Sequence, residues 1–158
     1  MDGIEERPER YRALMAAYFD SAIPFIEALD MRVTDAGDNY ACMHLPFSPK
    51  LVADPVRGLI HTGVMTALVD SASGLAVFCA LPEMQSIATL DLRMDYLRPA
   101  IAELDLRVRA ECFRLTRNIA FTRAEVHQGD KPEPVAVSNA TFMRSASRRS
   151  RREHERTS

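Results

Sequence analysis

The chain of 158 residues has no tryptophan, few aromatic residues (7%) and only three cysteines. Cys42, Cys79 and Cys112 are widely spaced and form no CxxC pair, which argues against a disulfide framework and a zinc site and favours reduced thiols in a cytoplasmic protein. The N-terminal segment has no basic region followed by an apolar one, so we expect no signal peptide. No apolar run reaches about 18 residues without a polar interruption, so we expect no membrane span.

The overall composition, with 47% hydrophobic and 27% charged residues, is typical of one globular domain. A chain of this length buries roughly 68–70% of its unfolded surface and needs no disulfide or metal to fold. The net charge of −2 hides an asymmetry, because residues 144–158 hold six arginines and two glutamates. Residues 145–158 contain no apolar side chain larger than alanine, so we predict a disordered basic tail and no nucleic-acid partner.

Apolar periodicity predicts the order of the elements. Helical spacing indicates a helical extension over residues 1–30 and a long helix over 61–81, with an unpatterned loop over 48–60 before it. Alternating residues predict a hairpin and four further strands, over residues 31–47, 86–99, 102–115, 118–128 and 133–144. The fold class is therefore α+β, with one long helix packed on an antiparallel sheet in a domain of residues 31–144.

The long helix, "HTGVMTALVDSASGLAVFCAL", carries one carboxylate, Asp70, and no lysine or arginine. Burying an unpaired carboxylate costs several kcal/mol, which is comparable with the whole margin of folding. Asp70 shares one side of the helix with small or hydroxyl-bearing residues, and bulky residues cover the other sides. An acid in such a place is a catalytic candidate, and a structural carboxylate at a dimer interface is the alternative.

The start of this helix is the second candidate feature. The first turn of a helix presents unpaired N–H groups, which stabilise a carbonyl oxygen that becomes negative. Gly63 lies in that turn, roughly 10 Å from Asp70 at 1.5 Å of rise per residue. This distance is too long for one chain to bring both groups to one carbon atom, so their cooperation requires a second subunit.

The segment "GLIHTGVMTALVDSASGLAV" resembles the H-G-G-x(6)-D helix of the PaaI-like acyl-CoA thioesterases, a family with the hotdog fold. "TLDLRMDYLRPA" and "RLTRNIAFTRAEV" look like the strands that follow, and the resemblance covers about Asp54 to Met143. It implies a homodimer joined edge to edge, paired again into a homotetramer. It also implies hydrolysis of an acyl-CoA without a metal or separate cofactor, CoA being part of the substrate.

The resemblance also implies residue roles. Asp70 matches the catalytic carboxylate, as general base on water or as nucleophile, and the N–H of Gly63, supported by His61, polarises the thioester carbonyl. Thr89 matches a residue that orients the water or the carboxylate. The remaining matches line the CoA site: Thr62, Tyr96, Arg98, Pro99, Arg114, Arg117 and Asn118.

Two positions depart from the family pattern. Thr62 stands where the motif has its second glycine, and glycine has greater backbone freedom than threonine. Asp54 stands where this group commonly has asparagine, and an ionised aspartate cannot donate the hydrogen bond that an asparagine amide donates. These departures keep a non-catalytic acyl-CoA or lipid-binding protein open as an alternative. A hotdog dehydratase or hydratase is a weaker alternative, because those families pair a histidine with a carboxylate at other spacings.

Overall fold

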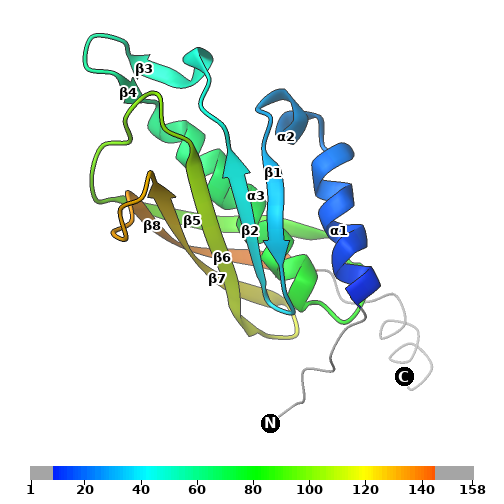
Figure 1. Ribbon diagram of the computed structural model, residues 1–158. Helices are drawn as coiled ribbons and strands as arrows, with labels where there is room; N and C mark the ends of the chain where they lie inside the picture. The colour runs from blue at the N-terminus through cyan, green and yellow to red at the C-terminus, as the bar shows by residue number, and fades with distance from the viewer. Residues whose placement is uncertain (1–8, 145–158) are drawn as a thin grey trace, which may run out of the picture.

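The computed structural model of the protein describes residues 9–144 (Figure 1). Two helices precede a hairpin and a short two-stranded segment, and a long helix is followed by four long strands. The elements are α1 (Glu9–Ser21), α2 (Pro24–Ala28), β1 (Arg32–Ala36), β2 (Tyr40–Leu45), the 3-10 turn η1 (Pro49–Leu51), β3 (Val52–Asp54), β4 (Leu59–Ile60), α3 (Thr62–Ala80), β5 (Ile87–Tyr96), β6 (Leu106–Leu115), β7 (Ile119–Gln128) and β8 (Ala136–Arg144). The predicted basic tail lies outside the described residues.

The main sheet has the strand order β1-β2-β6-β7-β8-β5, and every neighbouring pair is antiparallel. Strands β6 to β8 form the expected meander, whereas β5 pairs with β8 and becomes an edge strand. Strands β3 and β4 form a separate small sheet where the sequence predicted only a loop. Because these strands are three and two residues long, they are too short to show an alternating pattern.

Helix α3 packs on one face of this sheet and supplies much of the core (Figure 1). Its buried side chains include Met65, Leu68, Val69, Leu75 and Val77. By length and composition alone α3 could also cross a membrane, but 56% of its most apolar window is buried inside the protein, as in the core helix of this fold. The predicted α+β architecture, with a long helix on an antiparallel sheet and extra N-terminal helices, is confirmed.

Helix α1 covers the β1 edge of the sheet. The Asp20 carboxylate accepts a hydrogen bond of 2.7 Å from the backbone N–H of Val33 on β1. Phe19 packs edge-on against Phe78 of α3, with ring centroids 5.9 Å apart. At the opposite edge, within residues 9–144, β5 has a strand on one side only. Within residues 9–144 the two edges of the sheet therefore differ, because α1 lies along β1 whereas no described strand pairs with the outer side of β5.

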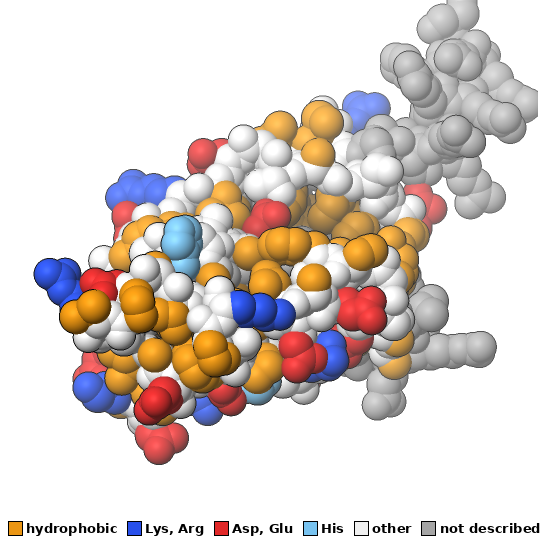
Figure 2. Space-filling model, turned by 90° about the horizontal axis from the view of Figure 1, so that it is seen from above, with side chains coloured by type: hydrophobic (Ala, Val, Ile, Leu, Met, Phe, Trp, Pro, Cys, Tyr) orange, Lys and Arg blue, Asp and Glu red, His pale blue; other side chains and the backbone are white. Residues whose placement is uncertain are grey.

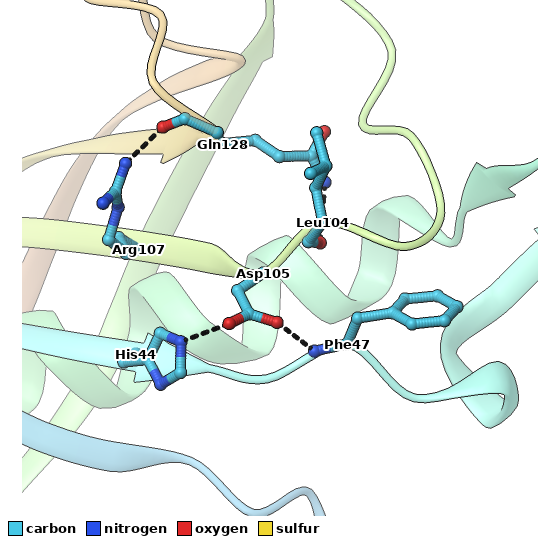
Figure 3. A network of polar contacts seen from close by, with 7 residues as sticks. His44, Phe47, Leu104, Asp105, Arg107 and Gln128 are labelled. Atoms are coloured by element: carbon cyan, nitrogen blue, oxygen red, sulfur yellow. Dashed lines mark hydrogen bonds and ion pairs between the residues drawn. The ribbon is translucent and has the colours of Figure 1, made fainter.

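Polar contacts tie together the loops at the start of β6 (Figure 3). The Asp105 carboxylate accepts a hydrogen bond of 2.7 Å from the backbone N–H of Phe47 and contacts Nε2 of His44 at 2.9 Å. The hydrogen bond from Phe47 and then that from His44 lower the pKa of Asp105 from its ordinary value. The side chain of Gln128 donates to the carbonyl oxygens of Ile101 and Leu104 at 2.8 and 3.1 Å. The loop between β5 and β6 is thus anchored to the sheet.

Candidate active site

Asp70 lies near the middle of α3, on the side of the helix that faces β5. Its carboxylate is half-buried, and Oδ1 accepts a hydrogen bond of 2.9 Å from Oγ1 of Thr89. The carboxylate therefore keeps contact with water in a single chain, and the large desolvation cost expected from the sequence is not imposed in the protomer. Thr89, to which the resemblance assigns the orientation of the water or the carboxylate, is thus within hydrogen-bond distance of Asp70.

On the side of α3 that carries Asp70, the small side chains are accessible to solvent in the first half of the helix and buried in the second half. Gly63 is exposed and Thr66 is half-buried, like Asp70, whereas Ser73 and Gly74 are buried. A carboxylate, a hydroxyl group and a helix start thus share one accessible strip of surface. Small residues along such a strip allow another backbone or a ligand to approach closely.

Thr89 reaches Asp70 because β5 has a β-bulge. Thr89 lies opposite Phe142 on β8, but Asp91 lies opposite Thr141, so Leu90 is an extra residue in β5. Phe142 faces the core, and Thr89 therefore points to the same side of the sheet as α3. Leu90 is 55% exposed at the free edge of the sheet. The bulge aims the Thr89 hydroxyl at the helix, which is a common use of bulges near functional sites.

His61 caps the start of α3. Its Nδ1 accepts a hydrogen bond of 2.9 Å from the backbone N–H of Gly63. A Cβ atom at position 63 would lie 3.0 Å from the same Nδ1, so a larger residue here would require the His61 ring to shift, and the backbone of Gly63 does not have a positive φ. The Gly63 N–H is held by the imidazole ring in this structure, and any other acceptor must replace the ring to reach it.

The first turn of α3 also contacts the end of β5. The Tyr96 hydroxyl lies 2.9 Å from Oγ1 of Thr66 and 3.4 Å from the carbonyl oxygen of Thr62. Thr62 is helical and does not have a positive φ, so this backbone does not need the glycine of the family pattern. The sequence did not identify Thr66 as a site residue, although its position four residues before Asp70 places it on the same side of α3.

The Asp54 carboxylate is bound by groups of the turn that follows it. Its Oδ1 accepts hydrogen bonds of 3.0 Å from the backbone N–H groups of Val56 and Arg57, and its Oδ2 lies 3.7 Å from Nε of Arg57. The carboxylate thereby closes the turn between β3 and β4. Since an asparagine Oδ1 accepts the same hydrogen bonds, this turn is compatible with either side chain at position 54.

The predicted CoA-binding residues fall into two groups at opposite ends of β5. Tyr96 is the last residue of β5, and Arg98 and the exposed Pro99 lie just beyond it. Nη2 of Arg98 donates a hydrogen bond of 2.9 Å to the carbonyl oxygen of Glu133. The other group lies at the end of β6 (Arg114) and in the turn before β7 (Arg117 and Asn118), and all three residues are exposed. The backbone N–H of Arg144, which pairs with Ile87 at the start of β5, donates to the Asn118 carbonyl oxygen. The groups are separated by roughly 30 Å of strand at about 3.3 Å per residue, so one chain does not bring them together.

Exposed apolar side chains surround the start of α3. Figure 2, which looks onto the end of the molecule that carries β3 and β4, shows many apolar side chains across the middle of this face, with some charged ones among them and others along its margin. The exposed ones near this end are Val56, Tyr96, Leu97 and Ile101. Within residues 9–144, no cluster of three or more His, Cys, Asp or Glu side chains is arranged to hold a metal ion.

Residues 57–135 match the thioesterase superfamily. The chain belongs to this superfamily. The part of the sequence that matches runs from the turn between β3 and β4 to the residue before β8, and so includes the whole Asp70 helix and the strand that carries Thr89. Hydrolysis of a thioester is the chemistry of this superfamily.

Relatives of this thioesterase-superfamily chain extend the match over most of its length. It is 38% identical over 138 residues to a Halobacterium salinarum protein named as a proposed esterase, covering 82% of this chain and 89% of that one. It is 27% identical over 148 residues to the Escherichia coli protein named medium/long-chain acyl-CoA thioesterase YigI, covering 85% and 94% of the two chains.

A solved structure supports the same fold. An asparagine-to-aspartate mutant of the phenylacetic acid degradation protein PaaI from Thermus thermophilus is 32% identical and superposes with a TM-score of 0.68. The match covers 78% of this chain and all of that one (100%). The predicted resemblance to PaaI-like hotdog thioesterases is therefore confirmed.

Proposed function

We propose that this protein hydrolyses acyl-CoA thioesters to the free acid and CoA, in a site that two copies of the chain build together. The observation that carries the proposal is the hydrogen-bonded pair of Asp70 and Thr89 on the accessible strip of α3, beside the free edge strand β5. Acyl-CoA is the substrate class named for the YigI relative, and the cytoplasm supplies such esters.

The free β5 edge supports a two-fold dimer. Antiparallel pairing of two β5 strands would place the end of one strand beside the start of the other. Each protomer's Arg98 and Pro99 would then lie near its partner's Arg114, Arg117 and Asn118, which brings the two separated groups of expected CoA contacts together. The same operation would bring the Asp70 carboxylate of one copy toward the first turn of α3 in the other. A further pairing of dimers would give the homotetramer expected from the resemblance.

In this site the Gly63 N–H polarises the thioester carbonyl after the substrate oxygen replaces the His61 ring. With Asp70 as general base, the carboxylate takes a proton from water while the water oxygen adds to the carbonyl carbon. The tetrahedral oxyanion then expels the CoA sulfur, which receives the proton from Asp70. With Asp70 as nucleophile, the carboxylate oxygen adds first, CoA leaves, and water cleaves the resulting anhydride. No step of either route requires a metal ion or a separate cofactor.

The test is release of CoA from a panel of aryl-CoA and medium- and long-chain acyl-CoA esters. We expect turnover by the wild type and a loss of at least about 100-fold in kcat for Asp70→Asn, as expected when an acid–base group is removed. Asp91→Asn is the matched control, because it neutralises an exposed carboxylate of β5 that lies on the other face of the sheet. Undiminished turnover in Asp70→Asn contradicts the assigned role.

The non-catalytic acyl-CoA or lipid-binding function is the second candidate. It is favoured by the hydrogen bond between Gly63 and His61, which holds the oxyanion donor in this structure. Tight binding of acyl-CoA without turnover of any ester in the panel would select this alternative.

A further inference from the structure

The Tyr96 hydroxyl contacts a peptide group that is central to the proposed reaction. It lies 3.4 Å from the carbonyl oxygen of Thr62 and 2.9 Å from Oγ1 of Thr66, which itself lies 3.5 Å from the same oxygen. The Thr62 carbonyl and the Gly63 N–H belong to one peptide unit. Since a peptide unit is planar, fixing the oxygen at one end also fixes the direction in which the N–H points.

These contacts are additional to those that form the helix. A carbonyl in the first turn of an α-helix accepts a hydrogen bond from the N–H four residues later, so the Thr62 oxygen does not need Tyr96 for α3 to form. A second donor on this oxygen draws electron density from the peptide unit and strengthens its N–H as a donor, because linked hydrogen bonds polarise one another. A hydroxyl group at this position can therefore affect the orientation and polarity of the peptide unit without being needed for helix formation.

We propose that Tyr96, together with Thr66, is a positioning residue that holds the Thr62–Gly63 peptide unit with its N–H directed at the thioester carbonyl. This inference rests on the proposed function. It gives Tyr96 a different role from the CoA contact that the family resemblance implies. It also means that one strand, β5, orients both reacting parts of the site, since Thr89 holds Asp70 and Tyr96 holds the first turn of α3.

Tyr96→Phe removes only the hydroxyl group and tests the proposal directly. We expect kcat for acyl-CoA hydrolysis to fall about tenfold, as for loss of one hydrogen bond that orients a catalytic donor. KM and the inhibition constant of free CoA should stay within about twofold of the wild type, because a positioning residue does not bind the substrate.

Two variants of Thr66 test whether the hydroxyl pair acts as a unit. Thr66→Ala should lower kcat to a similar extent, and the double variant with Tyr96→Phe should be no worse than either single variant by more than about twofold. Thr66→Ser keeps the hydroxyl and should retain wild-type kcat. Tyr18→Phe is the matched control, because Tyr18 and Tyr96 are both 44% exposed and Tyr18 lies on α1; its kcat should equal that of the wild type.

Two kinetic results would overturn the inference. If Tyr96→Phe raises KM and weakens inhibition by CoA while kcat is unchanged, Tyr96 is a CoA ligand. If none of these constants changes, its hydroxyl has no part in the reaction.

Amide hydrogen exchange at Gly63, followed by NMR, separates this inference from the proposed function. We expect faster exchange at Gly63 in Tyr96→Phe than in the wild type or Tyr18→Phe, whether or not the protein hydrolyses thioesters. An inactive wild type with this faster exchange supports the positioning role and contradicts only the proposed activity. Equal exchange rates in Tyr96→Phe and the wild type contradict the positioning role itself.

Discussion

Thr89 donates a 2.9 Å hydrogen bond to Asp70, although the alternation of β5 places Thr89 on the opposite face from the helix. Counted in steps of two, Thr89 belongs with Asp91, Arg93 and Asp95 on the polar face. The bulge at Leu90 shifts the count by one residue and turns Thr89 toward α3. One extra residue in an edge strand therefore joins two side chains from different elements.

Thr89→Val should lower kcat by about 10- to 100-fold, because a hydrogen bond to a charged group contributes roughly 1.5–3 kcal/mol. Valine keeps the shape and the strand preference of threonine, so the fold should be unchanged. Thr89→Ser keeps the donor and should stay within about threefold of the wild type. Thr141→Val is the control, since Thr141 is a half-buried threonine on the other face of the sheet. Steady-state kinetics with one acyl-CoA decide the outcome, and equal kcat values for Thr89→Val and the wild type would remove Thr89 from the site.

The sequence predicts the long elements well because their periodicity is local. The helix predicted over 61–81 is α3 (Thr62–Ala80), and the four predicted strands after it are β5 to β8. The pairing of β5 with β8 is not visible in the sequence, because it depends on contacts between residues such as Ile87 and Arg144 that are distant along the chain. The bulge at Leu90 is hidden for the same reason, since it exists only relative to the partner strand.

The site was predictable where it lies within one short segment and not where it joins several. The helix motif identified His61, Gly63 and Asp70 together, because their spacing along α3 sets their geometry. The contact of Tyr96 with Thr66 joins β5 to α3 and was not predicted from the sequence. The separation of Arg98 from Arg117 follows from the strand order, which only the structure supplies.

Mixing two inactive variants tests whether two chains share one site. Asp70→Asn removes the acid, and Gly63→Val puts a branched side chain against the His61 ring, where we expect it to block access to the Gly63 N–H. If each site takes Asp70 from one copy and Gly63 from the other, a mixed dimer holds one intact site. Random mixing of unfolded chains followed by refolding should then restore about a quarter of the wild-type activity, as expected for a two-fold symmetric dimer. If both residues act within one chain, the mixture stays as inactive as its components, provided that size-exclusion chromatography shows the same oligomer in every sample.

The cysteines should differ sharply in reactivity. Burial raises the pKa of Cys112 to about 11, so little thiolate forms there at neutral pH. Cys79 is also buried, whereas Cys42 is half-exposed with its Sγ 3.7 Å from Nη1 of Arg109. We expect one rapidly reacting thiol per folded chain with an aromatic disulfide reagent, and none in Cys42→Ser. Rapid reaction of a second thiol in the folded Cys42→Ser variant would contradict the burial of the other two. Cys42→Ser also removes the background in assays that detect CoA by its thiol.

Asp105 should make the stability of the protein depend on pH in the acid range. Its pKa is lower in the folded protein than its ordinary value, chiefly because of the hydrogen bond from Phe47 and then that from His44. A carboxyl group of this kind stabilises the fold at pH values above its unfolded pKa of about 3.9, and the contribution is lost as the pH falls through the lower folded value. Asp105→Asn should therefore be less stable than the wild type at pH 6, and the difference should shrink as the pH falls toward 3.

Thermal unfolding of both proteins between pH 6 and pH 3 measures this difference in Tm. Asp130→Asn is the matched control, because Asp130 is an exposed carboxylate that lines the same surface hollow as Asp105, and its Tm should follow that of the wild type. The side chain of Asp105 is half-exposed, so water weakens its contacts and the change in Tm should be only a few degrees. We expect the Tm difference between Asp105→Asn and the wild type to shrink as the pH falls. A difference that grows instead would contradict the role of Asp105 in holding Phe47.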